Sequence, residues 1–167
     1  KRDFENSITH LHNAEIAYRR SGDLIHAAEM PIDVGLCLAS LGNIEPALDT
    51  MTYSRRLYTQ LLSSPDSTTR HAAMVGVSRS YYFAFSSLYQ ADQLRRALEY
   101  LVKLENVTIE FGMMDRLPNL YNSFGATYID LGDVDKALQY YTRALKMAEE
   151  SNGWDDQQRL LDNISRI

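Results

Sequence analysis

The sequence predicts an all-α fold, a right-handed α-solenoid of antiparallel helix pairs with about eight helices. Three observations lead to this prediction. One sequence pattern occurs twice, at 40–48 and at 130–138, with Leu-Gly followed by a polar residue and later by Ala-Leu. Apolar residues recur at helical spacing along the chain. Gly-Asp or Gly-Asn turns separate many of the helical stretches. Repeats of this size are typical of stacked helices.

Two weaker copies of the pattern lie at 94–101 and 3–8. The small residues that align in the four copies are 40, 50 and 40 residues apart along the chain: Ser7, Ala47, Ala97 and Ala137. The longer spacing contains the segment 63–69, which is rich in turn-forming residues and therefore predicts a longer loop.

We expect residues 1–167 to form one helical array. In chain order, the predicted elements are a single helix over 3–20, helix pairs over roughly 23–62, 68–111 and 113–151, and a single helix over 155–167. Because the first and last helices lack a partner, we expect the chain to be part of a longer array.

The last pair, over 113–151, shows the predicted layout most clearly. Gly132 ends its first helix, and Asp133 caps the second. Gly125 and Ala137 are small at positions where the two helix backbones must approach closely. The apolar stripes of the two helices are Leu117, Leu120, Phe124, Tyr128 and Leu131, followed by Val134, Ala137, Leu138, Tyr141, Ala144, Leu145 and Ala148.

These residues resemble the tetratricopeptide repeat. The family pattern of apolar residue, Gly, Tyr, turn Gly, Ala, aromatic and Ala is matched by Phe124, Gly125, Tyr128, Gly132, Ala137, Tyr141 and Ala144. The pair over 23–62 matches less closely, through Val34, Gly35, Leu38, Gly42, Ala47, Met51 and Ser54. The middle pair departs most, because Phe85 replaces the small Gly and Asp92 replaces the turn Gly. We therefore expect wider packing in the middle pair, filled by Tyr81, Phe85 and Leu88.

The resemblance implies that a peptide binds in a concave groove lined by the first helix of each pair. The groove positions of the family fall on Glu29, Ile32, Leu36, Ala39, Arg79, Tyr82, Ser86, Tyr89, Asn119, Asn122, Ala126, Ile129, Asp130, Arg159, Asp162 and Arg166. We predict that the contact residues are Arg79, Tyr82, Tyr89, Asn119, Asn122 and Arg159. The alternative is that these residues only form solvated helix faces. The carboxylate clamp of chaperone-tail binders does not fit, because Ile32 and Leu36 occupy two of its positions.

The resulting functional hypothesis is a protein–protein interaction scaffold that binds a protein or peptide partner. The alternative is a sensory or regulatory module of a bacterial signalling protein or transcription regulator that carries a separate output domain. The sequence contains no nucleophile motif, glycine-rich phosphate loop or zinc-ligand spacing. We therefore expect no enzyme activity, metal or cofactor.

Composition further limits the classes of partner that the chain is expected to bind. The net charge of -5 and the pI of about 5.3 argue against a nucleic-acid surface. No apolar run is long enough to predict a membrane span, so we expect no membrane contact. The single cysteine, Cys37, fits a reducing compartment and slightly favours the cytoplasm.

The two unpaired end helices predict self-association of the chain. Each of them has apolar residues that a missing neighbour would cover. These residues are Phe4, Ile8 and Leu11 near the start, and Leu160, Leu161 and Ile164 near the end.

Overall fold

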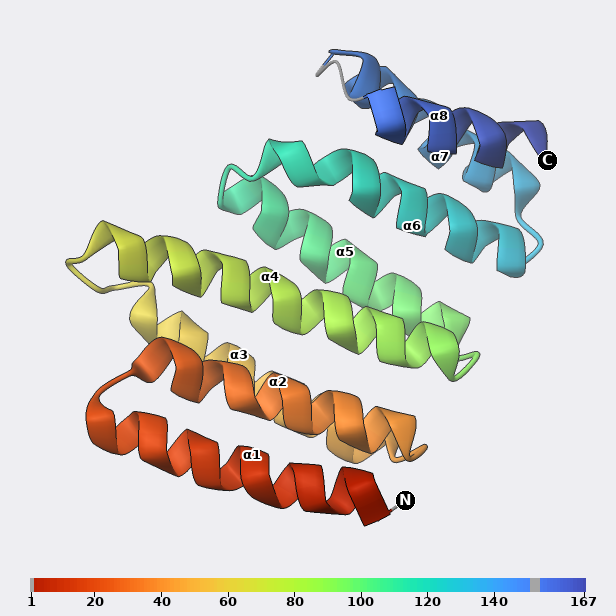
Figure 1. Cartoon of the computed structure of the whole chain (residues 1–167). Coiled ribbons are helices and arrows are strands. Elements are labelled where there is room, and N and C mark those ends of the chain that lie inside the picture. Colours follow the sequence, from red (N-terminus) through yellow and green to blue (C-terminus); the bar gives the residue numbers. More distant parts are fainter. Residues whose placement is uncertain (1, 151–153) are drawn as a thin grey trace. The chain divides into compact units, whose positions relative to one another are not determined.

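The computed structural model of the protein describes residues 2–150 and 154–167, and these residues form eight α-helices, one short 3-10 turn and no β-strand (Figure 1). The helices are α1 (Arg2–Ser21), α2 (Leu24–Ser40), α3 (Ile44–Leu61), α4 (Ser67–Gln90), α5 (Leu94–Glu110), α6 (Leu117–Asp130), α7 (Val134–Glu150) and α8 (Trp154–Ser165). The predicted all-α helical-repeat fold class is confirmed. No described helix has the length and apolar character needed to cross a lipid bilayer.

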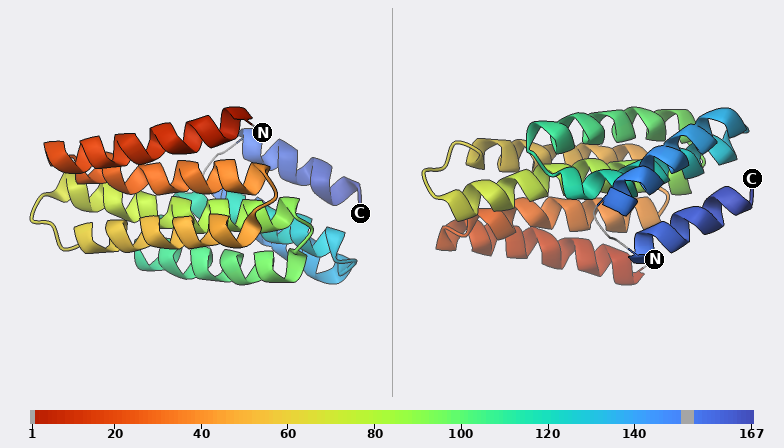
Figure 2. Two further views of the ribbon diagram at one scale, coloured as in Figure 1. Left: turned by 90° about the horizontal axis from the view of Figure 1, so that it is seen from below. Right: turned by 90° about the horizontal axis from the view of Figure 1, so that it is seen from above.

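The helices are grouped in two compact units, Lys1–Asp92 and Gln93–Ile167. In the first unit, α2 packs against α1, α3 and α4, and α3 packs against α4 (Figure 2). In the second unit, α6 packs against α5, α7 and α8, and α7 packs against α8. The boundary between the units falls inside the helix pair predicted over 68–111.

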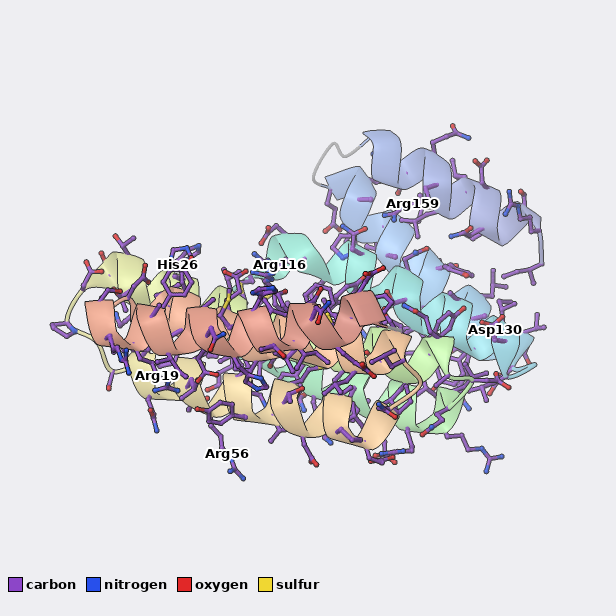
Figure 3. The ribbon with its side chains drawn as sticks, turned by 60° about the horizontal axis from the view of Figure 1, so that its bottom comes forward. Arg19, His26, Arg56, Arg116, Asp130 and Arg159 are labelled. Atoms are coloured by element: carbon purple, nitrogen blue, oxygen red, sulfur yellow. The ribbon has the colours of Figure 1, made fainter. Side chains whose placement is uncertain are left out.

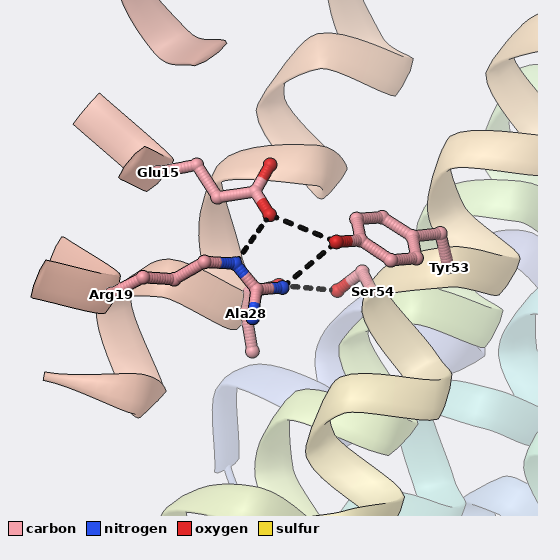
Figure 4. Close-up of polar contacts among 5 residues, drawn as sticks. All are labelled: Glu15, Arg19, Ala28, Tyr53 and Ser54. Carbon is pink, nitrogen blue, oxygen red and sulfur yellow. Dashed lines mark hydrogen bonds and ion pairs between the residues drawn. The ribbon is translucent and has the colours of Figure 1, made fainter. Parts of the chain in front are cut away.

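A three-residue cluster joins α1 to α3 in the first unit. Arg19 extends from α1 towards α3 (Figure 3). Its Nη2 donates a hydrogen bond to the Tyr53 hydroxyl at 2.8 Å, and its Nε pairs with Glu15 Oε1 at 2.9 Å. The Tyr53 hydroxyl donates to the same Glu15 oxygen at 3.0 Å (Figure 4). The closed triangle satisfies three polar groups at once and links α1 to α3 through side chains.

The second unit has a counterpart of this contact at a sequence offset of 90. Positions 105 and 143 correspond to Glu15 and Tyr53. Arg143 Nη1 on α7 lies 3.8 Å from Glu105 Oε1 on α5. The sequence repeat therefore extends to side-chain contacts between second helices, although the residue types differ.

Five of the turns between the described helices share one backbone pattern, a residue with a positive φ. Gly132 has a φ of +78°, in the left-handed region that ends a helix, and the residue at the equivalent turn after α4 is Asp92, with a φ of +58°. Asp133 then accepts a hydrogen bond from the backbone nitrogen of Lys136 at 3.2 Å, so it caps α7 as predicted. Asp92 therefore occupies the position of the turn glycine, and its backbone adopts the left-handed conformation that glycine has in the other turns.

We expect Asp92→Gly to stabilise the protein by about 0.5–1 kcal/mol, because glycine adopts a positive φ without a Cβ clash. The reverse change, Gly132→Asp, should lower the free energy of unfolding by a similar amount. Urea unfolding of both variants measures the effect. An Asp92→Gly protein that is less stable than the parent would mean that the aspartate side chain contributes more than its backbone strain costs.

Close helix contacts occur at glycines. A Cβ on Gly125 would lie 2.5 Å from Tyr141 Cε1, which agrees with the expected close approach in the last pair. The close contact at Gly76 of α4 was not expected: a Cβ there would lie 2.4 Å from Tyr58 Cε1 of α3. Phe85, the bulky residue that the sequence singled out in α4, is itself buried.

Candidate functional site

The predicted groove positions of the first unit lie on α2 and α4, which pack side by side (Figures 1 and 2). Arg79 Nη1 on α4 is 2.5 Å from Glu29 Oε1 on α2. Both residues are predicted groove positions, one on each of two successive first helices. The pair holds a positive and a negative group on this face, and both side chains stay partly exposed.

Asp33 lies one helical turn after Glu29 on α2. Burial raises the pKa of its carboxyl group, and the charge of Glu29 raises it further, while Arg79 acts in the opposite direction. Burial also raises the pKa of Tyr58 to about 12, with a smaller contribution from Glu29. Two carboxylates and one guanidinium therefore lie around the buried tyrosine. Asp33 is not one of the predicted groove positions, although its i+4 spacing from Glu29 places both residues on one helix face.

An aromatic ridge follows on α4. The Tyr82 side chain is 47% exposed, and its ring centroid lies 6.1 Å from that of Phe85. The Tyr89 ring is half-buried, and its centroid lies 5.7 Å from that of Phe85. Leu88 is fully buried, and Tyr81 is half-buried beneath the guanidinium of Arg55. Tyr82 is thus the most accessible of these aromatic groups.

The predicted positions of the second unit lie on α6 and α8. Arg159 on α8 donates a hydrogen bond to the amide oxygen of Asn119 on α6. Asn163 Nδ2 donates to Asn122 Oδ1 at 2.8 Å. Both asparagine oxygens on α6 are therefore already engaged by α8. Asn163 was not predicted; its place 41 residues after Asn122, close to one repeat length, was the available signal.

Two sequence-based expectations about exposure are wrong. Ile32, a predicted groove position, is completely buried, because α2 is covered by three helices. Leu160, expected to be uncovered at the end of the chain, is also completely buried. Phe4 and Leu161, at 40% and 48% exposure, do remain accessible. Among the described residues, no group of three or more His, Cys, Asp or Glu side chains could hold a metal ion.

Comparison with known proteins agrees with this architecture. Residues 118–151 match the tetratricopeptide repeat family. Over 87 residues the chain is 32% identical to outer dynein arm-docking complex subunit 4 of Danio rerio, an alignment that covers 50% of this chain and 18% of that protein. The predicted resemblance to tetratricopeptide-repeat proteins is confirmed.

Two solved structures share the fold. The apo form of RapI superposes with a TM-score of 0.77 at 17% identity, over 99% of this chain and 43% of RapI. BtubC from P. vanneervenii gives a TM-score of 0.75 at 15% identity, over 96% of this chain and 64% of BtubC. The chain therefore spans less than two thirds of each relative, and at these identities the structures show similarity of fold alone.

Proposed function

We propose that this chain is a protein–protein interaction scaffold that binds a peptide or protein partner on the first helices of its pairs. Tetratricopeptide repeats generally mediate protein–protein interaction. The observation that carries the proposal is the surface on α2 and α4, where a 47% exposed Tyr82 lies on the same helix as Arg79 and its ion pair with Glu29. Tyrosine and arginine are the residue types most enriched at binding hot spots.

The chemistry of this surface suits an extended peptide. Tyr82 offers apolar area with a polar tip, and Tyr89 adds a second ring on the same helix. In the second unit, the Asn122 amide uses its oxygen to accept from Asn163, and its NH2 group is a hydrogen-bond donor for a peptide carbonyl. Asn119, one helical turn before Asn122, accepts a hydrogen bond from Arg159.

We expect Tyr82→Ala and Asn122→Ala each to weaken partner binding by about 1–2 kcal/mol, roughly five- to thirtyfold, without loss of folding. The probe is a peptide selected from a random phage-displayed library on the wild-type chain, with its affinity measured by fluorescence anisotropy.

The matched controls are Tyr100→Ala and Asn106→Ala on α5, a second helix, and their affinities should stay at the wild-type value. The double variant Tyr82→Ala with Asn122→Ala is the decisive case. If it melts normally and binds as tightly as wild type, the first helices are not the binding surface.

A further inference from the structure

The outer face of α7 forms a shallow depression that is open to solvent. Its lining residues are Asp135, Leu138, Gln139, Thr142, Arg143 and Lys146. The buried stripe of α7, which includes Ala137, Tyr141 and Ala144, lies on the other side of the helix. Most of the lining residues are therefore directed away from the packed side of α7. Arg143 is the exception, because its guanidinium lies over the Tyr121 ring of α6 and near Glu105 of α5, although its side chain remains 58% exposed.

An apolar residue is uncovered at this surface. The Leu138 side chain is 42% exposed, and Val134, one turn earlier, is 47% exposed. The residue at the equivalent repeat position of the first unit is Leu48, which is only 5% exposed. The same repeat position thus holds a covered leucine in one unit and an uncovered one in the other. Burying an exposed leucine is favourable, so this face gains from a partner.

The two ends of the depression have opposite charges. Asp135 lies at the start of α7 and Lys146 lies three turns later. Neither side chain makes an ion pair or hydrogen bond with another described residue, whereas the neighbouring Lys136 is paired with Asp133 at 2.6 Å. Both charges at the ends of the depression are therefore available to a partner.

We propose that this outer face of α7 binds the same face of a second copy of the chain, with the two helices antiparallel. A two-fold axis between positions 140 and 141 places position 135 opposite 146, 138 opposite 143, and 139 opposite 142, because each pair of numbers has the same sum. Asp135 of each copy then faces Lys146 of the other. Such an interface is isologous and closes at the dimer.

The remaining pairs are also compatible. Leu138 packs on the aliphatic stem of Arg143 of the other copy, since long basic side chains cover apolar surface. The Arg143 guanidinium can keep its position over the Tyr121 ring of its own copy. Gln139 and Thr142 can exchange a hydrogen bond. Antiparallel helices also place each positive amino end beside a negative carboxyl end. A parallel arrangement would instead bring like charges together at both ends.

We expect a weak, concentration-dependent dimer. One helix face per copy buries much less than the roughly 1,600 Å² of a standard interface. The two Asp135–Lys146 pairs lie at the rim, where exposed ion pairs contribute little affinity but determine orientation. This dimer is separate from the partner binding proposed for the first helices, and it differs from association through the chain ends.

The test uses sedimentation equilibrium of the full chain over a wide concentration range. Wild type should show a reversible monomer–dimer equilibrium. Asp135→Lys and Lys146→Glu should each weaken dimerisation at least tenfold, because each creates like charges at both ends of the antiparallel pair. An equimolar mixture of the two single variants should restore the dimer, because every opposed pair then has opposite charges.

The matched controls lie on the outer face of α3. Arg56 is the residue 90 positions before Lys146, and its side chain extends into solvent (Figure 3). Arg56→Glu and Asp49→Lys should leave the dimer unchanged. The proposal is overturned if the wild type stays monomeric, if the α7 variants dimerise like wild type, or if their mixture stays monomeric. If the chain instead associates through α1 and α8, the α7 variants will dimerise like wild type. If another helix covers Leu138, the wild type will stay monomeric. Thermal melts confirm that each variant is folded.

Discussion

Gly125→Leu is expected to lower the free energy of unfolding by about 3 kcal/mol, the upper end of the usual cost of overpacking. A Cβ alone at this position would lie 2.5 Å from Tyr141 Cε1 and 2.8 Å from Cζ. The Tyr141 ring has little space to move, because its side chain is only 4% exposed. The leucine side chain would therefore force α6 and α7 apart. Urea unfolding monitored by circular dichroism measures the loss.

The contact can be isolated by a double-mutant cycle. Gly125→Leu in a Tyr141→Ala background should cost much less than in the wild type, because the ring that causes the clash is absent. Gly76→Leu in the first unit should show the same behaviour with Tyr58, whose ring lies 2.4 Å from a Cβ at that position. Equal costs in both backgrounds would show that the glycine is small for another reason.

The sequence predicted the helix contacts that local patterns encode. Gly125, the turn at Asp92 and the cap at Asp133 each depend on residues within one helix pair, and the repeat fixed their register. Gly76 could not be found in this way. Its partner Tyr58 precedes the longer loop at 63–69, where the repeat spacing is interrupted, and the pattern placed the expected small residue at Phe85 instead.

The candidate site was predictable in its positions but not in its contacts. Helical periodicity and the family resemblance selected Glu29, Arg79, Asn119 and Arg159, and the structure pairs these residues within their units. The pairing itself depends on the relative rotation of two helices, which no local pattern encodes. The same rotation buries Ile32, because α4 packs directly on α2.

Stability is expected to fall as the pH rises from about 10 to 12, and Tyr58 is one cause. Its pKa is raised from 10.0 to about 12 in the folded protein, chiefly by burial. The unfolded chain therefore loses this proton first. The contribution is complete below pH 10 and is lost as the pH rises through the folded pKa, by about 2.7 kcal/mol for two pKa units. Tyr121, also raised to about 12 by burial and by its hydrogen bond to Glu105, adds to this trend.

The Tyr58→Phe variant separates this effect from the titration of lysines and other tyrosines, which both proteins share. Below pH 10 the difference in unfolding free energy between the variant and wild type should be constant. Above pH 10 it should shift steadily in favour of the variant, because phenylalanine has no proton to lose in the unfolded state. Urea unfolding at a series of pH values gives this difference, and tyrosinate absorbance follows the late-titrating hydroxyl groups directly. A difference that stays flat to pH 12 would mean that Tyr58 ionises in the folded protein as readily as in the unfolded chain, and that water reaches its hydroxyl beside Glu29 and Asp33.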